Sequence, residues 1–196
     1  MSTLKTNGIV ANNGTGPIAS LPQSGGSNFQ LGPNWGAWEF VSGTDLTVIT
    51  NLDFTSLAAG YDYQILLQGV SPTTDAQLLY ARFSQSASFL SGASDYTDGT
   101  TDGSTQIDLC FAITAANDEH LNMELSIPEP NVASRRKKIF GTAAMGRSAN
   151  NLESFPDNTC GRLDANLNAC DGVRLFWASG TWQAVGKAYL FRRRLS

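Results

Sequence analysis

The chain has 196 residues, which is enough for one domain with a buried core, alone or with an added arm. Charged residues make up 15% of it, below the roughly 25% of an average soluble protein, and the net charge of −4 gives no reason to expect nucleic acid as a partner. No apolar run approaches the roughly 20 residues of a transmembrane helix, so no membrane partner is expected, and Met1–Ser20 lacks the apolar centre of a signal peptide. This composition is typical of turn-rich all-β proteins.

Residues 1–33 differ in composition from the rest of the chain. They are rich in Gly, Asn, Ser, Thr and Pro, and their apolar residues are too sparse to offset the entropy of ordering the segment alone. The segment is therefore either a disordered tail or an extended N-terminal arm that becomes ordered against neighbouring subunits. We favour the arm because apolar residues recur every few positions. Its predicted contact residues are Ile9, Val10, Ile18, Leu21, Phe29 and Leu31.

The globular domain is predicted over residues 34–196. Apolar side chains alternate with other residues in several runs, and this period of two is what a strand with one buried face requires. A turn is predicted at Ser71–Asp75, because proline is not accommodated inside a central strand. Thr55–Ala59 is expected to form at most a short helical turn. The predicted strands are one or two between Leu46 and Phe54, then Tyr61–Leu67, Leu78–Phe83, Ile107–Ile113 and Leu121–Ile127.

The C-terminal residues 172–196 predict a hairpin of two strands joined at Ser179-Gly180. Apolar residues alternate in the first strand and continue through the second. A hairpin this apolar must be covered by a second sheet. With about eight or nine strands separated by turn clusters, the predicted fold is an antiparallel β-sandwich of the jelly-roll or Greek-key kind. The pattern argues against the parallel sheet of many metabolic enzymes.

Two long polar segments, Gly92–Ser104 and Asn150–Asp171, are predicted as loops. Loops at one end of a rigid sandwich are a natural binding surface, and Tyr96 is the aromatic residue that we expect to be exposed there. The Asp residues of the first loop could ligate calcium or could simply be turn residues; we expect no bound metal and no cofactor. The calcium candidates are Asp95, Asp98 and Asp102, and the predicted glycan or host contacts are Tyr96, Asp98, Asp102 and Asn158.

The three cysteines fit neither a disulfide-rich scaffold nor a zinc site. Cys110 lies in an apolar run and is expected to be a small buried side chain. Cys160 and Cys170 flank a short segment of the second predicted loop. Two alternatives stay open for this pair, namely a disulfide between them or two free thiols.

No residue pattern indicates catalysis. The single histidine, His120, is placed in a predicted surface turn, and the motifs of a nucleophile or a zinc site are missing. Glu is scarce and the Asp residues occur in turns, so the paired carboxylates of a glycoside hydrolase are not expected, and we predict that the protein is not an enzyme. Five arginines have two possible roles: they either stay solvated or pair with carboxylates, within the domain or on a neighbouring subunit. They are Arg135, Arg136, Arg192, Arg193 and Arg194.

Three segments between residues 35 and 191 carry spaced motifs. A Tyr-rich strand runs into a V-x-P-x-T-D turn followed by L-x-x-R, a later segment marks a strand entry, and the last pair of strands carries spaced glycines. The positions are Val70, Pro72, Thr74, Asp75, Leu79 and Arg82, then Pro130, Lys137 and Gly141, then Phe176, Ser179, Gly180, Gly186 and Leu190. Together these segments resemble a β-sandwich domain that recurs in virion proteins of tailed bacteriophages.

The resemblance implies a location and a structural role. A member of this group would be a virion component, such as a capsid decoration, head-fibre or tail-associated protein. It would attach through residues 1–33 and assemble as a homotrimer, with capsid, collar or tail proteins as partners. The alternative is a receptor-binding module of a phage fibre that contacts host-surface glycans. The chain departs from the group where its final strand ends in Arg192–Arg194 instead of a short neutral tail.

Overall fold

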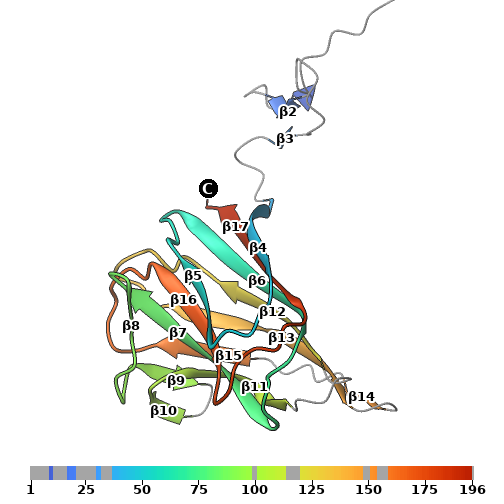
Figure 1. Cartoon of the computed structure of the whole chain (residues 1–196). Coiled ribbons are helices and arrows are strands. Elements are labelled where there is room, and N and C mark those ends of the chain that lie inside the picture. Colours follow the sequence, from blue (N-terminus) through green and yellow to red (C-terminus); the bar gives the residue numbers. More distant parts are fainter. Residues whose placement is uncertain are drawn as a thin grey trace, which may run out of the picture.

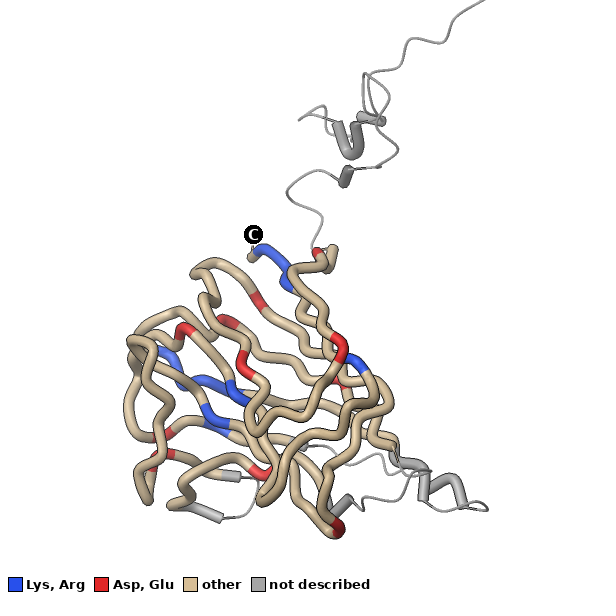
Figure 2. The backbone as a smooth tube through the Cα atoms, viewed as in Figure 1, with Lys and Arg blue, Asp and Glu red and all other residues tan. Residues whose placement is uncertain are grey.

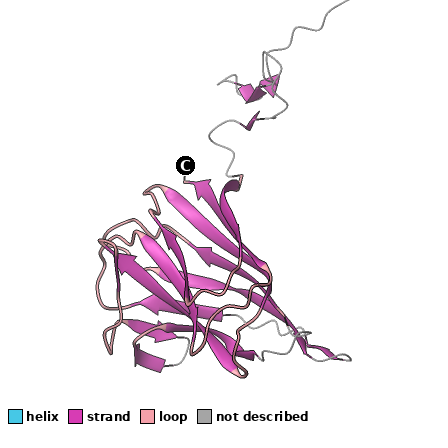
Figure 3. Cartoon of the chain, viewed as in Figure 1, coloured by secondary structure: helices cyan, strands magenta, loops and turns pink. Residues whose placement is uncertain are grey.

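The structure, a computed structural model, describes residues 37–98, 101–113, 120–147 and 159–195, together with four short strands outside these ranges. In the described residues every regular element is a β-strand and no helix is present (Figure 3). The predicted all-β class is therefore confirmed. The short helical turn allowed for Thr55–Ala59 does not form, because Thr55 ends a strand and the chain continues without helical structure.

The bounds of the strands follow the chain from the N-terminus to the C-terminus (Figure 1). They are β1 Ile9–Val10, β2 Pro17–Ser20, β3 Gln30–Leu31, β4 Glu39–Asp45, β5 Asn51–Thr55, β6 Tyr61–Val70, β7 Gln77–Gln85, β8 Ser88–Phe89, β9 Tyr96–Asp98, β10 Thr101–Ser104, β11 Ile107–Ile113, β12 Leu121–Ile127, β13 Lys138–Arg147, β14 Asn151–Glu153, β15 Thr159–Leu163, β16 Gly172–Trp177 and β17 Lys187–Arg194.

Two antiparallel sheets pack face to face and form a β-sandwich, as predicted (Figure 1). The larger sheet has the order β10-β9-β15-β13-β12-β6-β17-β4, with β14 beside β13. The smaller sheet has the order β11-β7-β16-β5, with β8 beside β7. The strands β1, β2 and β3 pair with one another in a small antiparallel sheet.

The sandwich is a jelly roll with added strands. When β8–β10 and β13–β15 are set aside, eight strands of the domain remain, in the orders β12-β6-β17-β4 and β11-β7-β16-β5. Each sheet combines strands from both halves of the domain, and the first strand, β4, pairs with the last, β17. Two interlocked Greek keys produce this arrangement. The predicted jelly-roll architecture is therefore confirmed.

The predicted C-terminal hairpin is wrong. β16 pairs with β5 and β7 in the smaller sheet, whereas β17 pairs with β4 and β6 in the larger one. The residues between them, 178–186, form an arch from one sheet to the other, in which Trp182 is fully buried and bridges to Pro72. The backbone N–H of Thr73 also donates to the carbonyl of Thr181 at 2.8 Å. Alternation identifies both strands but carries no information about which sheet each one joins.

Strands whose apolar residues alternate clearly lie at the predicted positions, whereas strands with weaker alternation were not predicted or have other bounds. β11 and β12 have the predicted bounds. Of the one or two strands expected between Leu46 and Phe54, one is present: β5 begins at Asn51, whereas Leu46 is a buried residue between β4 and β5. Both segments predicted as loops contain strands, because β9 and β10 lie in the first and β14 and β15 in the second. These short polar strands extend the larger sheet beyond β12.

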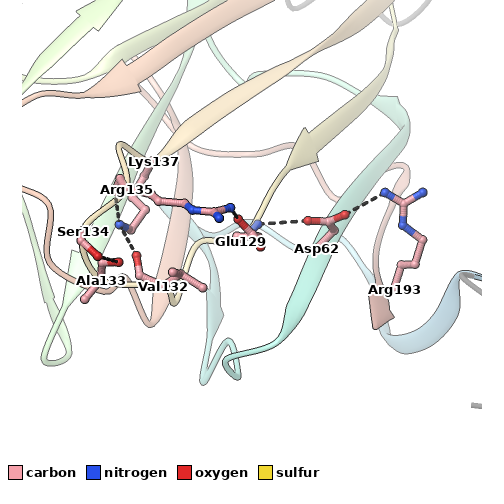
Figure 4. Close-up of polar contacts among 8 residues, drawn as sticks. All are labelled: Asp62, Glu129, Val132, Ala133, Ser134, Arg135, Lys137 and Arg193. Carbon is pink, nitrogen blue, oxygen red and sulfur yellow. Dashed lines mark hydrogen bonds and ion pairs between the residues drawn. The ribbon is translucent and has the colours of Figure 1, made fainter. Parts of the chain in front are cut away.

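The connection between β12 and β13 is built around Lys137, which is 1% exposed (Figure 4). Its ammonium group donates hydrogen bonds to the carbonyl oxygens of Val132, at 2.7 Å, Leu167, at 3.4 Å, and Arg135. Burial lowers the pKa of Lys137, and its charge interaction with the Cys170 thiol opposes that shift. Since backbone acceptors from separate parts of the chain converge on one buried donor, this side chain fixes the path of the connection.

Candidate functional site

A pocket of about 270 Å³ opens on the outer face of the larger sheet. It is lined by Thr97 of β9, Lys138–Phe140 of β13 and Cys160–Arg162 of β15. None of these three strands belongs to the eight-stranded jelly roll, and all lie beyond β12 in the larger sheet (Figure 1). The pocket is therefore a feature of the strands that this chain adds to the fold.

Strand register brings the lining side chains together. Lys138 is opposite Arg162, and Phe140 is opposite Cys160. Arg162 is in turn opposite Thr97 on β9. Because paired residues project to the same face of a sheet, these side chains form two adjacent rows. Phe140 is 46% exposed, so its ring is the main apolar surface of the pocket.

The opposite face of the same strands packs on the core. Ile139 is fully buried, and Gly161 lies so close to β11 that a Cβ atom on it would be 2.2 Å from Cγ2 of Ile107. A larger residue at position 161 would push β15 away from the smaller sheet. Packing beneath the sheet, and not the exposed side chains, therefore holds the pocket in place.

Asp164 organises the charges beside the pocket. Its carboxylate accepts hydrogen bonds from Thr97, Arg136 and, at 2.8 Å, Nε of Arg162. Burial alone would raise the pKa of Asp164, but these hydrogen bonds and the charges of the two arginines outweigh burial and lower it. Lys138 is the second cation on the pocket wall, so the described lining residues include two cations and no carboxylate.

Cys160 and Cys170 are free thiols in different environments. Cys160 is exposed in the pocket beside Phe140, whereas Cys170 is buried in the core, where burial raises the pKa of its thiol to about 11. Of the two alternatives that the sequence left open, the structure has the free thiols. Cys110 packs against the core, as predicted for an apolar side chain, but is only partly buried.

We expect Cys160 to react with a maleimide well before Cys170. Attack requires an exposed and deprotonated thiol, and at neutral pH the buried Cys170 is neither. Brief labelling of the native chain followed by peptide mass spectrometry should place the label on Cys160. In denaturant the two thiols should react at similar rates. Equal labelling of both thiols in the native chain would contradict the burial of Cys170.

A second exposed surface lies at the other edge of the larger sheet. Within the described residues β4 pairs only with β17, so its outer edge is unpaired. Phe40 is 63% exposed, and its ring meets that of Phe191 edge to face at 5.9 Å. The guanidinium of Arg193 lies over the ring of Trp38, 5.0 Å from its centre. The β4 edge surface, as it is called below, consists of Trp38, Phe40, Val41, Tyr189 and Phe191.

Four of the five predicted basic contact residues pair within the chain, and acidic and basic residues are scattered over the domain (Figure 2). Asp62 also accepts the backbone N–H of Glu129 at 3.1 Å, which ties β6 to the β12–β13 connection (Figure 4). Arg194 is exposed. Pairing within the domain, one of the alternatives that the sequence left open, is therefore what the structure shows for four of these five arginines. The pairs are Arg135 with Glu129, Arg136 with Asp164, Arg192 with Glu39 at 3.0 Å, and Arg193 with Asp62 at 2.7 Å.

The prediction that Tyr96 is exposed is wrong, because β9 joins the larger sheet and turns this side chain inward. Its hydroxyl accepts the N–H of Phe83 at 2.9 Å and donates to the carbonyl of Leu90 at 3.1 Å, and burial raises the pKa of Tyr96. Asp95 accepts the N–H of Gly92 at 2.5 Å, which is the behaviour of a turn residue. The predicted contacts whose side chains lie outside the described residues are Ile9, Val10, Ile18, Leu21, Phe29, Leu31, Asp98, Asp102 and Asn158.

The sequence predicts a binding surface on the segments that contain β9 and β15, but it does not predict the contribution of β13 or the β4 edge surface. The pocket residues Lys138 and Phe140 alternate with the buried Ile139, and this short run was a usable signal for a strand with an exposed aromatic residue. No local signal places Arg162 beside them, because that contact depends on how β13 and β15 pair. Phe40 similarly looks like a core residue until β4 is found at the edge of the sheet.

Among the described residues no three His, Cys, Asp or Glu side chains converge as a metal ion would require. His120 shares a hydrogen bond of 3.0 Å with the hydroxyl of Ser71. The part of the chain that is described contains no helix capable of crossing a membrane. Comparison of the chain with family models, with curated proteins and with solved structures found no match, so its function is inferred from geometry and from the sequence resemblance.

Proposed function

We propose that the chain is a structural, non-enzymatic component of a tailed-bacteriophage virion. The β4 edge surface carries this proposal. Three of its side chains, Trp38, Phe40 and Val41, are large, apolar and exposed, and they follow one another where residues 1–33 lead into the domain. Exposed apolar patches on a folded domain mark interaction surfaces, and aromatic residues dominate the energy of protein interfaces.

The partners in this proposal are other virion proteins and further copies of the chain. An unpaired edge strand next to exposed aromatic rings can add a strand from a neighbour and bury the rings at the same time. Residues 1–33 would reach such a neighbour, and a homotrimer would repeat the contact three times around one axis. Capsid decoration, a head fibre and a tail-associated position all fit this design.

Incorporation into particles tests the proposal. The wild-type chain should be found by mass spectrometry in purified virions of the phage that encodes it, and light scattering should show a trimer. Phe40→Ser and deletion of residues 1–33 should give folded chains that no longer enter particles. Phe140→Ser, the same change at another exposed aromatic residue of the same sheet, should enter normally. Absence of the wild-type chain from virions, or normal entry of both altered chains, would refute the proposal.

A second candidate function is binding of host-surface glycans, and the pocket favours it. Two of the three strands that line the pocket, β9 and β15, belong to the two polar segments that the sequence predicts as a binding surface. It combines an exposed aromatic ring with hydrogen-bonding and cationic side chains, as carbohydrate sites require. A fibre protein can hold both functions, since the pocket and the β4 edge surface are at opposite edges of the larger sheet. Binding to a glycan array tests this function.

A further inference from the structure

The pocket on β9, β13 and β15 has more positive charge than the neighbouring carboxylate, Asp164, neutralises. Lys138 and Arg162 are directly opposite each other on paired strands, and like charges in such pairs are destabilising. Asp164 offsets Arg162, but it also pairs with Arg136, and none of the lining residues that the structure describes is a carboxylate. An anion bound between Lys138 and Arg162 would relieve this repulsion through charge-assisted hydrogen bonds.

The remaining lining indicates what kind of molecule carries the anion. The volume of about 270 Å³ is just below the roughly 300–1,000 Å³ of most ligand sites, so the pocket suits a single ring with its substituents. Phe140 offers a flat, half-exposed apolar surface on which the C–H face of a sugar ring can pack. A neutral sugar would leave the two positive charges uncompensated, and a small inorganic anion would leave the ring of Phe140 uncovered.

We propose that this pocket binds an acidic sugar residue of the uronic acid type. The sugar carboxylate lies between Nζ of Lys138 and the guanidinium of Arg162, and the sugar ring lies on Phe140. Thr97 forms the wall on the β9 side, where its hydroxyl is held by Asp164. The inference rests on the glycan-binding function and deepens it by naming the class of sugar. It is independent of assembly through the β4 edge surface.

Calorimetric titration of the full chain with oligogalacturonate and with a hyaluronan oligomer tests this proposal. The matched probe is the methyl ester of the same oligogalacturonate, which keeps the rings and removes the charge. We expect the acids to bind, with an affinity that falls as salt is raised, and the ester to give no measurable heat. Lys138→Gln and Phe140→Ala should each weaken binding about tenfold, since each removes one of the two kinds of contact.

Lys187→Gln and Phe40→Ala are the matched controls. They remove an exposed lysine and an exposed aromatic ring from the opposite edge of the same sheet, and they should leave the affinity unchanged. A bound acid should also shield Cys160 from maleimide, because this thiol lines the pocket. This second readout reports on the pocket directly.

Each other outcome overturns a stated part of the proposal. Equal binding of acid and ester would overturn the acidic class and leave the glycan-binding function standing. Binding that survives Lys138→Gln and Phe140→Ala, with Cys160 still reactive, would place the sugar elsewhere and overturn the pocket. No binding of either acid or of the ester would overturn the inference, and a glycan array without hits would remove the glycan-binding function as well.

Discussion

Replacing Lys137 by methionine is expected to lower the free energy of unfolding by about 3 kcal/mol. Methionine keeps most of the apolar stem but leaves the carbonyl oxygens of Val132, Arg135 and Leu167 without their common donor. Each buried acceptor that loses its partner costs the energy of its desolvation. Urea unfolding followed by tryptophan fluorescence measures the loss, since Trp177 and Trp182 lie in the core.

Lys138→Met is the matched control for this variant. Lys138 is the next residue, has the same side chain and is exposed, so its loss should change stability by less than about 0.5 kcal/mol. Equal effects of the two substitutions would contradict the role given to the buried ammonium group.

The lowered pKa of Lys137 adds a test with a defined sign. Between that lowered pKa and the ordinary value of 10.5, the unfolded chain holds the lysine proton more tightly than the folded chain does. The contribution of Lys137 to stability therefore rises with pH across this interval. The difference in free energy of unfolding between wild type and Lys137→Met should grow as the pH is raised toward 10.5, and a shrinking difference would contradict the shift.

Trp182→Ala is expected to have the larger effect, a loss of about 4 kcal/mol. Trp182 is fully buried in the arch between β16 and β17, and its ring lies 5.0 Å from that of Trp177. Alanine would leave a cavity at the point where the chain passes from one sheet to the other. Thermal and urea unfolding should both show the loss, and near-wild-type stability would contradict the burial of this ring.

Trp182→Phe separates packing from hydrogen bonding at the same site. The indole N–H of Trp182 is buried and has no acceptor among the described residues. Phenylalanine therefore gives up ring volume but no hydrogen bond, and the expected loss is only about 1–2 kcal/mol. A loss as large as that of Trp182→Ala would mean that the indole N–H is engaged in a bond that this geometry does not have.

Periodicity predicted strands well and their partners poorly. Ile107–Ile113 and Leu121–Ile127 have the predicted bounds, because one face of each is buried and alternation records that burial. The sequence also predicts both C-terminal strands, but the Ser179-Gly180 turn predicts a hairpin that does not form. Contacts with strands far away in sequence decide which sheet a strand joins, and β17 pairs with β4 and β6. The alternation of residues within β17 gives no information about these partners.

The burial of particular polar side chains could not be predicted from the sequence either. Lys137 lies in the run Arg135–Lys138, in which every residue is basic and is therefore expected at the surface. It is buried only because backbone carbonyls of the connection and of Leu167 surround its ammonium group. Tyr96 lies in a polar segment for which exposure is the ordinary expectation, yet β9 joins the sheet and places its hydroxyl between two backbone groups. Neither environment is visible from neighbouring residues.

The pairing of the first and last strands of the domain governs when the native state can form. β17 lies between β4 and β6, so β4 cannot join the sheet before β17 has been synthesised and has paired with β6. Until then Phe40 of β4 lacks the ring of Phe191 against which it packs. Closure over such a long loop is slow, and exposed strand edges invite association in the interval. The larger sheet therefore closes only when β17 pairs with both β4 and β6.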